Sequence, residues 1–239
     1  MSPVGGRLAL FLLFTERRYS VKGRHESFLI DFQQVKDKKQ NHIERSLTEL
    51  YELFFSYMEH EANIREKVRA KQLFAHKTKV PGELVLEQPN TLHFEHWFAF
   101  DYVTVIGSRM FDLFIREKKG ELTKTMLDLS GFMMLMSLEP VRVKEVYDNS
   151  VIIESLYTGE IREANFFIII PELKKGEFSF VRTLRAGFKE MVFGPAFSID
   201  AKNEGKVISE LEKVYTSEDV TIKKYLKESG IDYFRYKKG

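Results

Sequence analysis

The sequence predicts an α+β protein in which an N-terminal helical part is followed by a small bent β-sheet or barrel with C-terminal helices packed on it. Three observations predict this architecture. Apolar residues recur at helical spacing over residues 41–76, alternate in short runs over residues 141–193, and return to helical spacing from Val207 onward. We therefore expect a helical N-terminal region over residues 1–80 and an α+β domain over residues 81–239.

The composition fits one large globular domain or two modest ones. Of the 239 residues, 44% are hydrophobic and 30% are charged, and 37 Lys and Arg stand against 35 Asp and Glu. This balance lacks the basic excess typical of strong nucleic-acid binders, although a local basic patch is compatible with it. The absence of Cys excludes disulfides, thiolate zinc sites, iron–sulfur ligation and a Cys nucleophile. Since a reducing compartment fits this composition, we expect a cytoplasmic protein.

The first twenty residues contain a short apolar run. Arg7 and the run Leu8–Phe14 resemble the start of a signal peptide, but residues 15–18 (TERR) stand where a small-residue cleavage site is expected. The run is also far shorter than the roughly 20 residues of a membrane span. We expect a strand or a short buried helix here, with a targeting remnant as the alternative, and no membrane span anywhere in the chain.

Residues 41–76 carry the clearest helical pattern. One face is apolar, with residues spaced three and four apart: Ile43, Leu47, Leu50, Phe54 and Met58. The pattern predicts one long helix, or two helices joined near Glu61–Asn63, ended by Pro81-Gly82. Upstream, residues 28–32 (FLIDF) predict a short strand or the entry to a helix. The apolar face at residues 43–58 also offers a surface for self-association, which leaves a homo-oligomer open.

The most aromatic stretch of the chain is TLHFEHWFAFDY, residues 91–102. It follows a strand expected at residues 83–88 and contains the only Trp of the sequence. Its aromatic residues are too dense for one helical face, so we expect this segment to be buried on more than one side.

The remaining elements change from helices to strands and back to helices. Helices are expected at residues 110–120 and, after Thr123, up to residue 136. Strands are expected at residues 141–146, 151–153, 157–160, 166–170, 178–181 and 191–193, with turns at 148–149, 158–159 and 185–187. A helix around residues 207–214 and another that is N-capped by Ser217, with Glu218 and Asp219 in its first turn, close the chain.

Between Gln88 and Ile199 this order of features resembles a bacterial domain. The resemblance rests on the aromatic segment Phe94–Tyr102, on Phe111 and Phe114 in the next helix, on the Leu-rich helix at residues 122–138, and on Thr158-Gly159-Glu160 between two strands. The domain occurs in proteins that often carry a C-terminal SEC-C metal-binding motif. This chain departs from that pattern, because without Cys it cannot form the SEC-C zinc tail. The family is largely uncharacterised, so the resemblance implies an architecture rather than an activity.

Catalytic motifs are missing from the sequence. It contains no Gly-x-Ser-x-Gly elbow, no Walker-type phosphate loop and no Gly-x-Gly-x-x-Gly. His93, Glu95 and His96 form the most suggestive cluster, but their spacing is not the His-Glu-x-x-His of a helical zinc hydrolase. We therefore expect a protein that is not an enzyme, with no catalytic residues, no metal site and no cofactor. A metal-dependent hydrolase that uses these three residues is the alternative.

Two basic and aromatic regions are candidate binding surfaces. In the β region, Arg182 and Arg185 lie among three aromatic residues, Phe178, Phe180 and Phe188. Small barrels bind nucleic acid by stacking bases on exposed aromatic residues beside Arg or Lys. The alternative is that Phe178 and Phe180 fill the barrel and the two arginines solvate its rim.

The second region is the basic helix around Arg65, Arg69 and Lys71, either a face that binds phosphates or an acidic protein, or an ordinary solvated face. At the end of the chain, Lys237 follows Tyr233, Phe234 and Tyr236, in either a contact arm or a packed last turn. We therefore expect a cytoplasmic binding or regulatory protein whose partner is a nucleic acid or another protein.

Overall fold

The computed structural model describes residues 22–217 and 221–239, with side chains from Asp31 onward. A compact unit runs from Lys39 to Gly239, and the described residues before it, 22–38, belong to a separate unit. In that first unit, residues 22–38 belong to helix α1 (Lys22–Glu61), so the segment 28–32 is helical and not a strand. The apolar run Leu8–Phe14 lies outside the described residues.

Two helices, not one, cover the region of the clearest helical pattern. Helix α1 ends at Glu61, and α2 (Ile64–Thr78) begins after Asn63, whose side chain accepts a hydrogen bond from the Arg65 backbone N–H. Residues 83–88 are not the expected strand. Gly82–Leu86 form a 3₁₀ turn, η1, because Pro81 fixes the backbone at the helix start and its carbonyl accepts from the Leu84 N–H.

Three further helices follow: α3 (Asn90–Phe100), α4 (Met110–Lys118) and α5 (Lys124–Leu135). The Thr123 side chain caps α5 by accepting from the Met126 N–H, at the helix start that the sequence predicts. On α3 the buried residues lie around the whole helix and include Phe94, Trp97 and Phe100. Burial of the aromatic stretch on more than one side is thus confirmed.

Within the described residues, six strands form one sheet. They are β1 (Leu138–Val146), β2 (Ser150–Ser155), β3 (Ile161–Phe167), β4 (Phe178–Ala186), β5 (Lys189–Phe193) and β6 (Phe197–Ser198). Residues 157–160 are a turn rather than a strand, with Gly159 at a φ of 65°.

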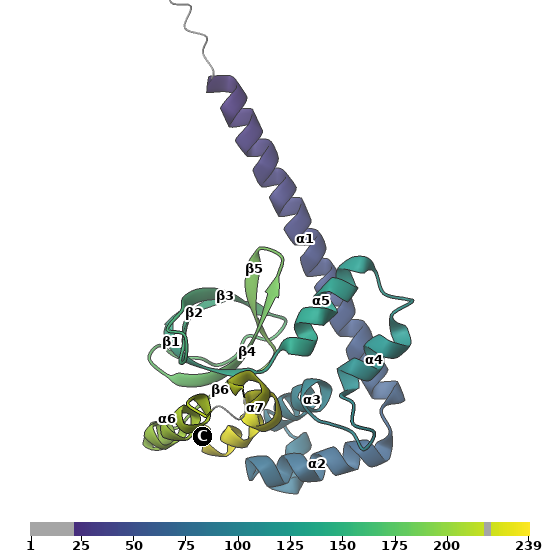
Figure 1. The fold of residues 1–239 in the computed structure, drawn as a ribbon, viewed down its shortest axis with the longest axis vertical. Helices are drawn as coiled ribbons and strands as arrows, with labels where there is room; N and C mark the ends of the chain where they lie inside the picture. Colours follow the sequence, from purple (N-terminus) through teal and green to yellow (C-terminus); the bar gives the residue numbers. More distant parts are fainter. Residues whose placement is uncertain (1–21, 218–220) are drawn as a thin grey trace, which may run out of the picture. The chain divides into compact units, whose positions relative to one another are not determined.

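The strand order is β1-β2-β3-β5-β4-β6, and an additional antiparallel pairing joins β4 to β1. That pairing closes β1–β5 into a small barrel, one of the two forms that the sequence left open, and Figure 1 shows these strands curled around one another. Since β4 lies beside β1 and β1-β2-β3 is a meander, the connectivity is a Greek key. The parallel pair β3–β5 completes the ring.

Helices α6 (Ala201–Tyr215) and α7 (Ile222–Ser229) follow the barrel, and the 3₁₀ segment η2 (Gly230–Tyr236) ends near the barrel strands. Thr221, not Ser217, precedes the first residue of α7, so the predicted cap is wrong; Glu218 and Asp219 lie outside the described residues. Tyr233 and Phe234 are buried, which favours the packed last turn over a contact arm.

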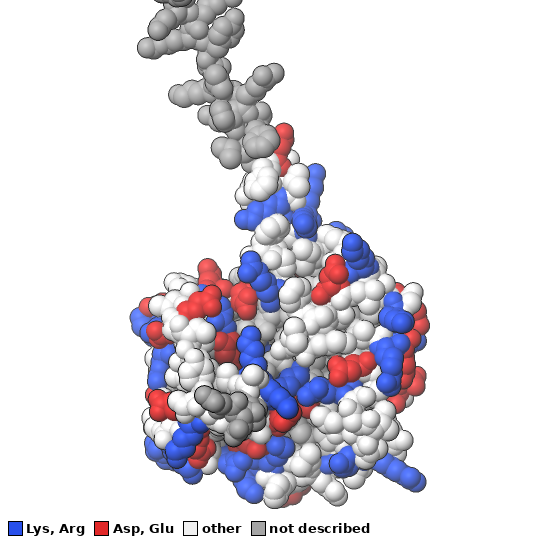
Figure 2. Space-filling view, viewed as in Figure 1, with Lys and Arg blue, Asp and Glu red and all other residues white. Residues whose placement is uncertain are grey.

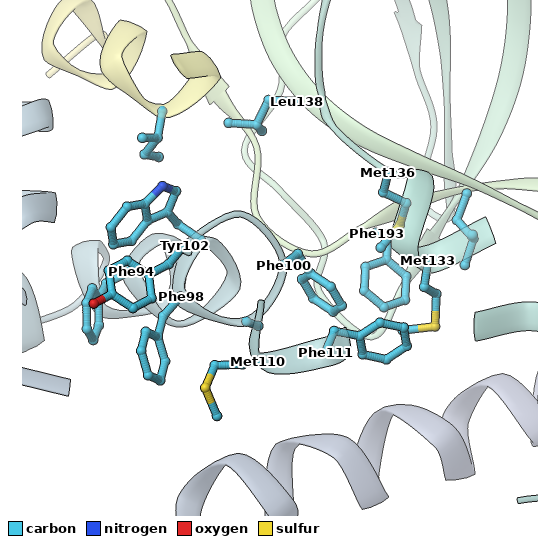
Figure 3. Close-up of a cluster of buried hydrophobic side chains, with 14 of the residues drawn as sticks. Phe94, Phe98, Phe100, Tyr102, Met110, Phe111, Met133, Met136, Leu138 and Phe193 are labelled. Carbon is cyan, nitrogen blue, oxygen red and sulfur yellow. The ribbon is translucent and has the colours of Figure 1, made fainter. Parts of the chain in front are cut away.

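Two cores stabilise the unit from Lys39 to Gly239. The larger core lies between the helices and the outer side of the barrel, and Figure 3 shows Phe100 of α3 beside Phe111 of α4 and Phe193 of β5. The ring centroid of Phe100 lies 5.4 Å from that of Phe111 and 5.6 Å from that of Phe193. The smaller core fills the barrel with aliphatic residues: Val141, Val143, Val151, Ile153, Ala164, Leu173, Val181 and Val192.

The larger core also takes up the apolar face of α1. Leu47, Leu50, Phe54 and Met58 are all buried within the same chain, in one cluster with Phe74 of α2 and with α3. These four residues are therefore covered within the chain, while Ile43 is only partly buried.

Candidate functional site

Arg182, one of the two predicted nucleic-acid-binding arginines of β4, is an interior residue. Its side chain is 3% exposed, and its two terminal nitrogens donate to the carboxylate of Asp101 at 3.2 and 2.6 Å. Since the guanidinium is covered and paired, it has no donor to offer a nucleic acid, and this prediction is corrected. The neighbouring Phe178 and Phe180 are buried too, as the alternative interpretation expected.

Lys227 of α7 shares the same buried carboxylate. Its Nζ lies 3.7 Å from Asp101 Oδ1 and donates to the Met136 carbonyl at 2.6 Å. Burial lowers the pKa of Lys227 to about 8, and the Asp101 charge opposes that shift. The cluster of Asp101, Arg182 and Lys227 thus joins α3, β4 and α7 through charged groups that are removed from water.

His93 and His96 of α3 also face the interior rather than a metal site. The Tyr51 hydroxyl lies 3.2 Å from His96 Nε2, and His96 is 3% exposed. Burial lowers the pKa of His93 to about 3 and that of His96 well below its usual value. Over residues 22–217 and 221–239 no group of three or more His, Asp or Glu is placed to hold a metal ion. The hydrolase alternative therefore gains no ligand set from this part of the chain.

The basic residues of α2 do not join those of the barrel. Arg65 and Arg69 are exposed, Arg69 lies 4.0 Å from Glu66 of the same helix, and Lys71 is half-buried. In Figure 1, α2 and the β4–β5 hairpin lie at opposite sides of the compact unit. These cations therefore do not extend a surface at the hairpin.

Lys237 is partly covered by its neighbours at the end of the chain. Its Nζ lies 4.6 Å from the centroid of the Phe234 ring and 3.3 Å from Asn90 Oδ1, and burial lowers its pKa. It packs on the 3₁₀ segment rather than extending from it.

Arg185 is a predicted site residue that the structure places at two hollows of the barrel. It is exposed, and among the described residues no carboxylate pairs with it. The hairpin around it is fixed by Gln40 of α1, whose side chain donates to the Ala186 carbonyl and accepts from the Phe188 N–H at 3.1 and 2.8 Å. Gly187 has a φ of 66°, and a Cβ there would lie 2.6 Å from Gln40 Oε1.

One hollow lies beside this hairpin; we call it the hairpin groove. It measures about 400 Å³ and runs between α1, α5 and the tip of the hairpin. Phe132 and Phe188 are 52% and 50% exposed on its walls. Lys39 Nζ lies 5.9 Å from the centroid of the Phe188 ring, and Arg185 lines the same groove. The groove thus combines accessible aromatic rings with two cations.

The second hollow is the open end of the barrel; we call it the barrel mouth. Side chains alternate along a strand, so the residues in phase with the aliphatic lumen also point inward. At this end they are polar: Glu139, Ser155, Arg162, Thr183, Arg185 and Glu190. The cavity measures about 470 Å³, and Leu135, Tyr215 and Ile222 from the neighbouring helices line its other wall.

Arg162 of β3 is the central polar residue of the barrel mouth. Its guanidinium forms an ion pair with Glu139 and donates to Thr183 Oγ1 at 3.5 Å. Its Nε lies 3.9 Å from Glu190 Oε1, which is too far for a hydrogen bond, and no described protein group accepts from it. The Tyr157 hydroxyl, on the same cavity, likewise has no partner among the described residues.

Charges of both signs are interspersed on the surface. Figure 2 shows Lys and Arg mixed with Asp and Glu on the visible face of the compact unit, without a broad area of one sign. In the described part of the chain, no helix is long and apolar enough to cross a membrane.

Comparisons with protein-family models, with curated proteins and with solved structures find no match to this chain. The class that the fold and the site define is an α+β protein built on a closed Greek-key barrel with a polar mouth. Sequence reasoning found Arg185 and missed Tyr157, Arg162 and Glu190. Their one signal was strand phase: Arg162 and Glu190 are each two residues from a buried apolar residue, Ala164 and Val192.

Proposed function

We propose that this chain is a non-catalytic binding protein that holds single-stranded nucleic acid in the hairpin groove. The observation that carries the proposal is the pair of half-exposed rings, Phe132 and Phe188, beside Lys39 and Arg185. Bases stack on such rings with little sequence preference, while cations next to them contact phosphates. Small Greek-key barrels, the OB-fold among them, are known to bind oligonucleotides on their outer strands and loops.

The charges define how strong this binding is. Two cations line the groove and Asp128 also borders it, so the electrostatic part of the binding is small. For a single strand, each neutralised phosphate contributes about −0.7 to the slope of log K against log salt concentration. Two contacts therefore predict a slope of about −1.4, and stacking supplies the rest of the affinity. Duplexes bind more weakly, because their bases are not free to stack on the rings.

The test is fluorescence anisotropy with labelled single-stranded RNA, single-stranded DNA and duplex DNA at several salt concentrations. Phe188→Ala should weaken single-strand binding by about 5- to 150-fold, since stacking on one ring contributes about 1–3 kcal/mol. Arg185→Gln should weaken it less and reduce the salt slope by about 0.7. Lys213→Gln, which removes an exposed cation of α6, is the matched control and should change neither quantity. No binding at low salt, or equal binding by Phe188→Ala, contradicts the proposal.

A further inference from the structure

The basic helix α2 carries an exposed apolar surface that the hairpin groove does not explain. Large aliphatic side chains of α2 and of the loop at residues 102–109 are between 42% and 70% exposed: Ile64, Val68, Val103, Val105 and Ile106. Single exposed aliphatic residues are common, but several gathered in one place mark an interaction site. We call this surface, together with the cations beside it, the α2 patch.

The loop packs against α2 through Glu66. The Glu66 carboxylate accepts from the Tyr102 hydroxyl at 2.6 Å and from the Val105 N–H at 3.3 Å. Its side chain is 14% exposed, and it is the only carboxylate in residues 64–79 and 102–109. The helix and the loop therefore form one surface, and the one anion of these two segments is largely covered.

Arginine side chains lie between the two groups of aliphatic residues. At 3.6 residues per turn, Arg65 and Arg69 project between the side of α2 that carries Ile64 and Val68 and the side that faces the loop. Arg65 and Arg69 also line one surface hollow of about 360 Å³ with Ile64 and Val68. Lys71 adds a half-buried cation next to Ile64 on the helix. The patch is thus a row of cations with aliphatic side chains on both flanks.

The composition of the α2 patch differs from that of a protein–protein interface. Such interfaces are enriched in aromatic residues, Met and Arg, and they are depleted in Lys. Of these features the patch has only arginine, because its exposed apolar residues are all Val or Ile. Aliphatic side chains beside cations complement the boundary of an anionic bilayer, where apolar chains lie beneath negatively charged headgroups.

The backbone of the loop is paired within the chain. The Thr104 N–H donates to the Ser108 carbonyl at 3.0 Å, and the Gly107 N–H donates to the Thr104 carbonyl at 2.9 Å. The Val105 N–H is taken by Glu66. Unpaired backbone groups oppose entry into the apolar part of a bilayer, so this internal pairing suits the loop tip for such an environment.

We propose that the α2 patch docks on the surface of a membrane that contains anionic lipids. Arg65, Arg69 and Lys71 contact the headgroups, and Val105 and Ile106 enter the boundary between headgroups and acyl chains. The proposal does not depend on the hairpin groove, because α2 and the β4–β5 hairpin lie at opposite sides of the compact unit in Figure 1.

The first test is cosedimentation of the full-length chain with lipid vesicles. The chain should bind vesicles that contain phosphatidylserine and not vesicles of phosphatidylcholine alone, and salt should weaken the binding by screening. Arg65→Gln and Arg69→Gln should each weaken it about fivefold, since one cation near an anionic surface contributes about 1 kcal/mol. Lys213→Gln, which removes an exposed cation of α6, is the matched control and should change nothing.

The absence of Cys lets a single label report whether the loop enters the bilayer. Ile106→Cys and Ile161→Cys each provide one thiol for an environment-sensitive fluorophore. Ile161 of β3 is 60% exposed against 66% for Ile106, so it is the matched control. On phosphatidylserine vesicles, the emission of the label at position 106 should shift to shorter wavelength and that at position 161 should not. Without a label, Ile106→Ser should weaken vesicle binding about tenfold, because this side chain leaves water on docking.

Each measurement has an outcome that overturns the proposal. No sedimentation with phosphatidylserine vesicles at low salt does so, and so does unchanged binding by both arginine variants. An equal response of the two labels would place the contact elsewhere. Poly-glutamate is the probe for an acidic protein: if it binds as tightly as the vesicles and Ile106→Ser alters neither, the lipid proposal fails. Phe188→Ala should leave vesicle binding unchanged, so a failure of the groove proposal is separate from a failure here.

Discussion

The two faces of β4 place an arginine side chain in opposite environments, one buried and paired, the other exposed. On the outer face, Arg182 is 3% exposed and bonded to Asp101 within the larger core. On the lumen face, three residues along, Arg185 is exposed at the barrel mouth and pairs with no carboxylate of the described residues. An odd spacing along a strand reverses the face, so two arginines that look equivalent in the sequence have different roles. The first stabilises the fold and the second is available for binding.

The largest expected effect comes from removing the partner of the buried arginine. Asp101→Ala leaves Arg182 and Lys227 without their carboxylate in the interior, and the free energy of unfolding should fall by about 3–5 kcal/mol. Arg185→Gln on the same strand should change it by no more than about 0.5 kcal/mol. Urea denaturation measures both. A loss below about 1 kcal/mol for Asp101→Ala would show that the buried ion pair of Arg182 does not stabilise the fold more than the exposed Arg185 does.

A smaller effect is expected where the turn after β5 packs on α3. Gly194 has a φ of 83°, and a Cβ there would lie 2.2 Å from His96 Cε1, so Gly194→Ala should destabilise by about 2 kcal/mol or more. Gly205→Ala is the control, because Gly205 lies in helix α6 and a Cβ there meets no atom within 4 Å. That variant should gain about 0.5–1 kcal/mol. Equal thermal midpoints for the two variants would contradict close packing on the outer face.

The smallest expected effect, expressed per pH unit, is a pH dependence from Lys227. Its pKa is about 8 in the folded chain, below the usual lysine value, so the unfolded state binds more protons above pH 8. Its contribution to stability therefore rises between pH 8 and 10, by at most about 1.4 kcal/mol per pH unit. In Lys227→Met this rise in the free energy of unfolding between pH 8 and 10, measured by urea denaturation, should be absent. An unchanged pH profile would place Lys227 in water rather than beside Asp101.

Local patterns predicted the local elements well. The break between α1 and α2, the Thr123 cap and the hairpins of the barrel follow from spacing, capping and turn residues close in the sequence. The 3₁₀ turn at Gly82–Leu86 was mistaken for a strand, since five residues are too few for periodicity to separate the two.

The candidate sites depend on distant pairings instead. In the β1–β4 pairing that closes the barrel, Glu139 lies opposite Val181, and no local sequence pattern predicts this pairing. Without that closure, Arg162 and Glu190 are ordinary polar residues of separate strands. The hairpin groove needs Phe132 and Lys39, which meet Phe188 only in the folded chain. The alternation of side chains along a strand, which can be read from the sequence alone, would have predicted that Arg182 and Arg185 lie on opposite faces of β4.

The closing β1–β4 pair and the parallel β3–β5 pair also have a consequence for biosynthesis. During translation β1, β2 and β3 leave the ribosome first and form a meander whose two outer strands both lack a neighbour. Open strand edges are templates for pairing with other chains, and the missing strands, β4 and β5, are only complete at Ala186 and Phe193. A chain that has reached β3 but not β4 and β5 therefore lacks the neighbours of two strand edges, and we expect chains that terminate in this interval to aggregate more readily than the full-length chain.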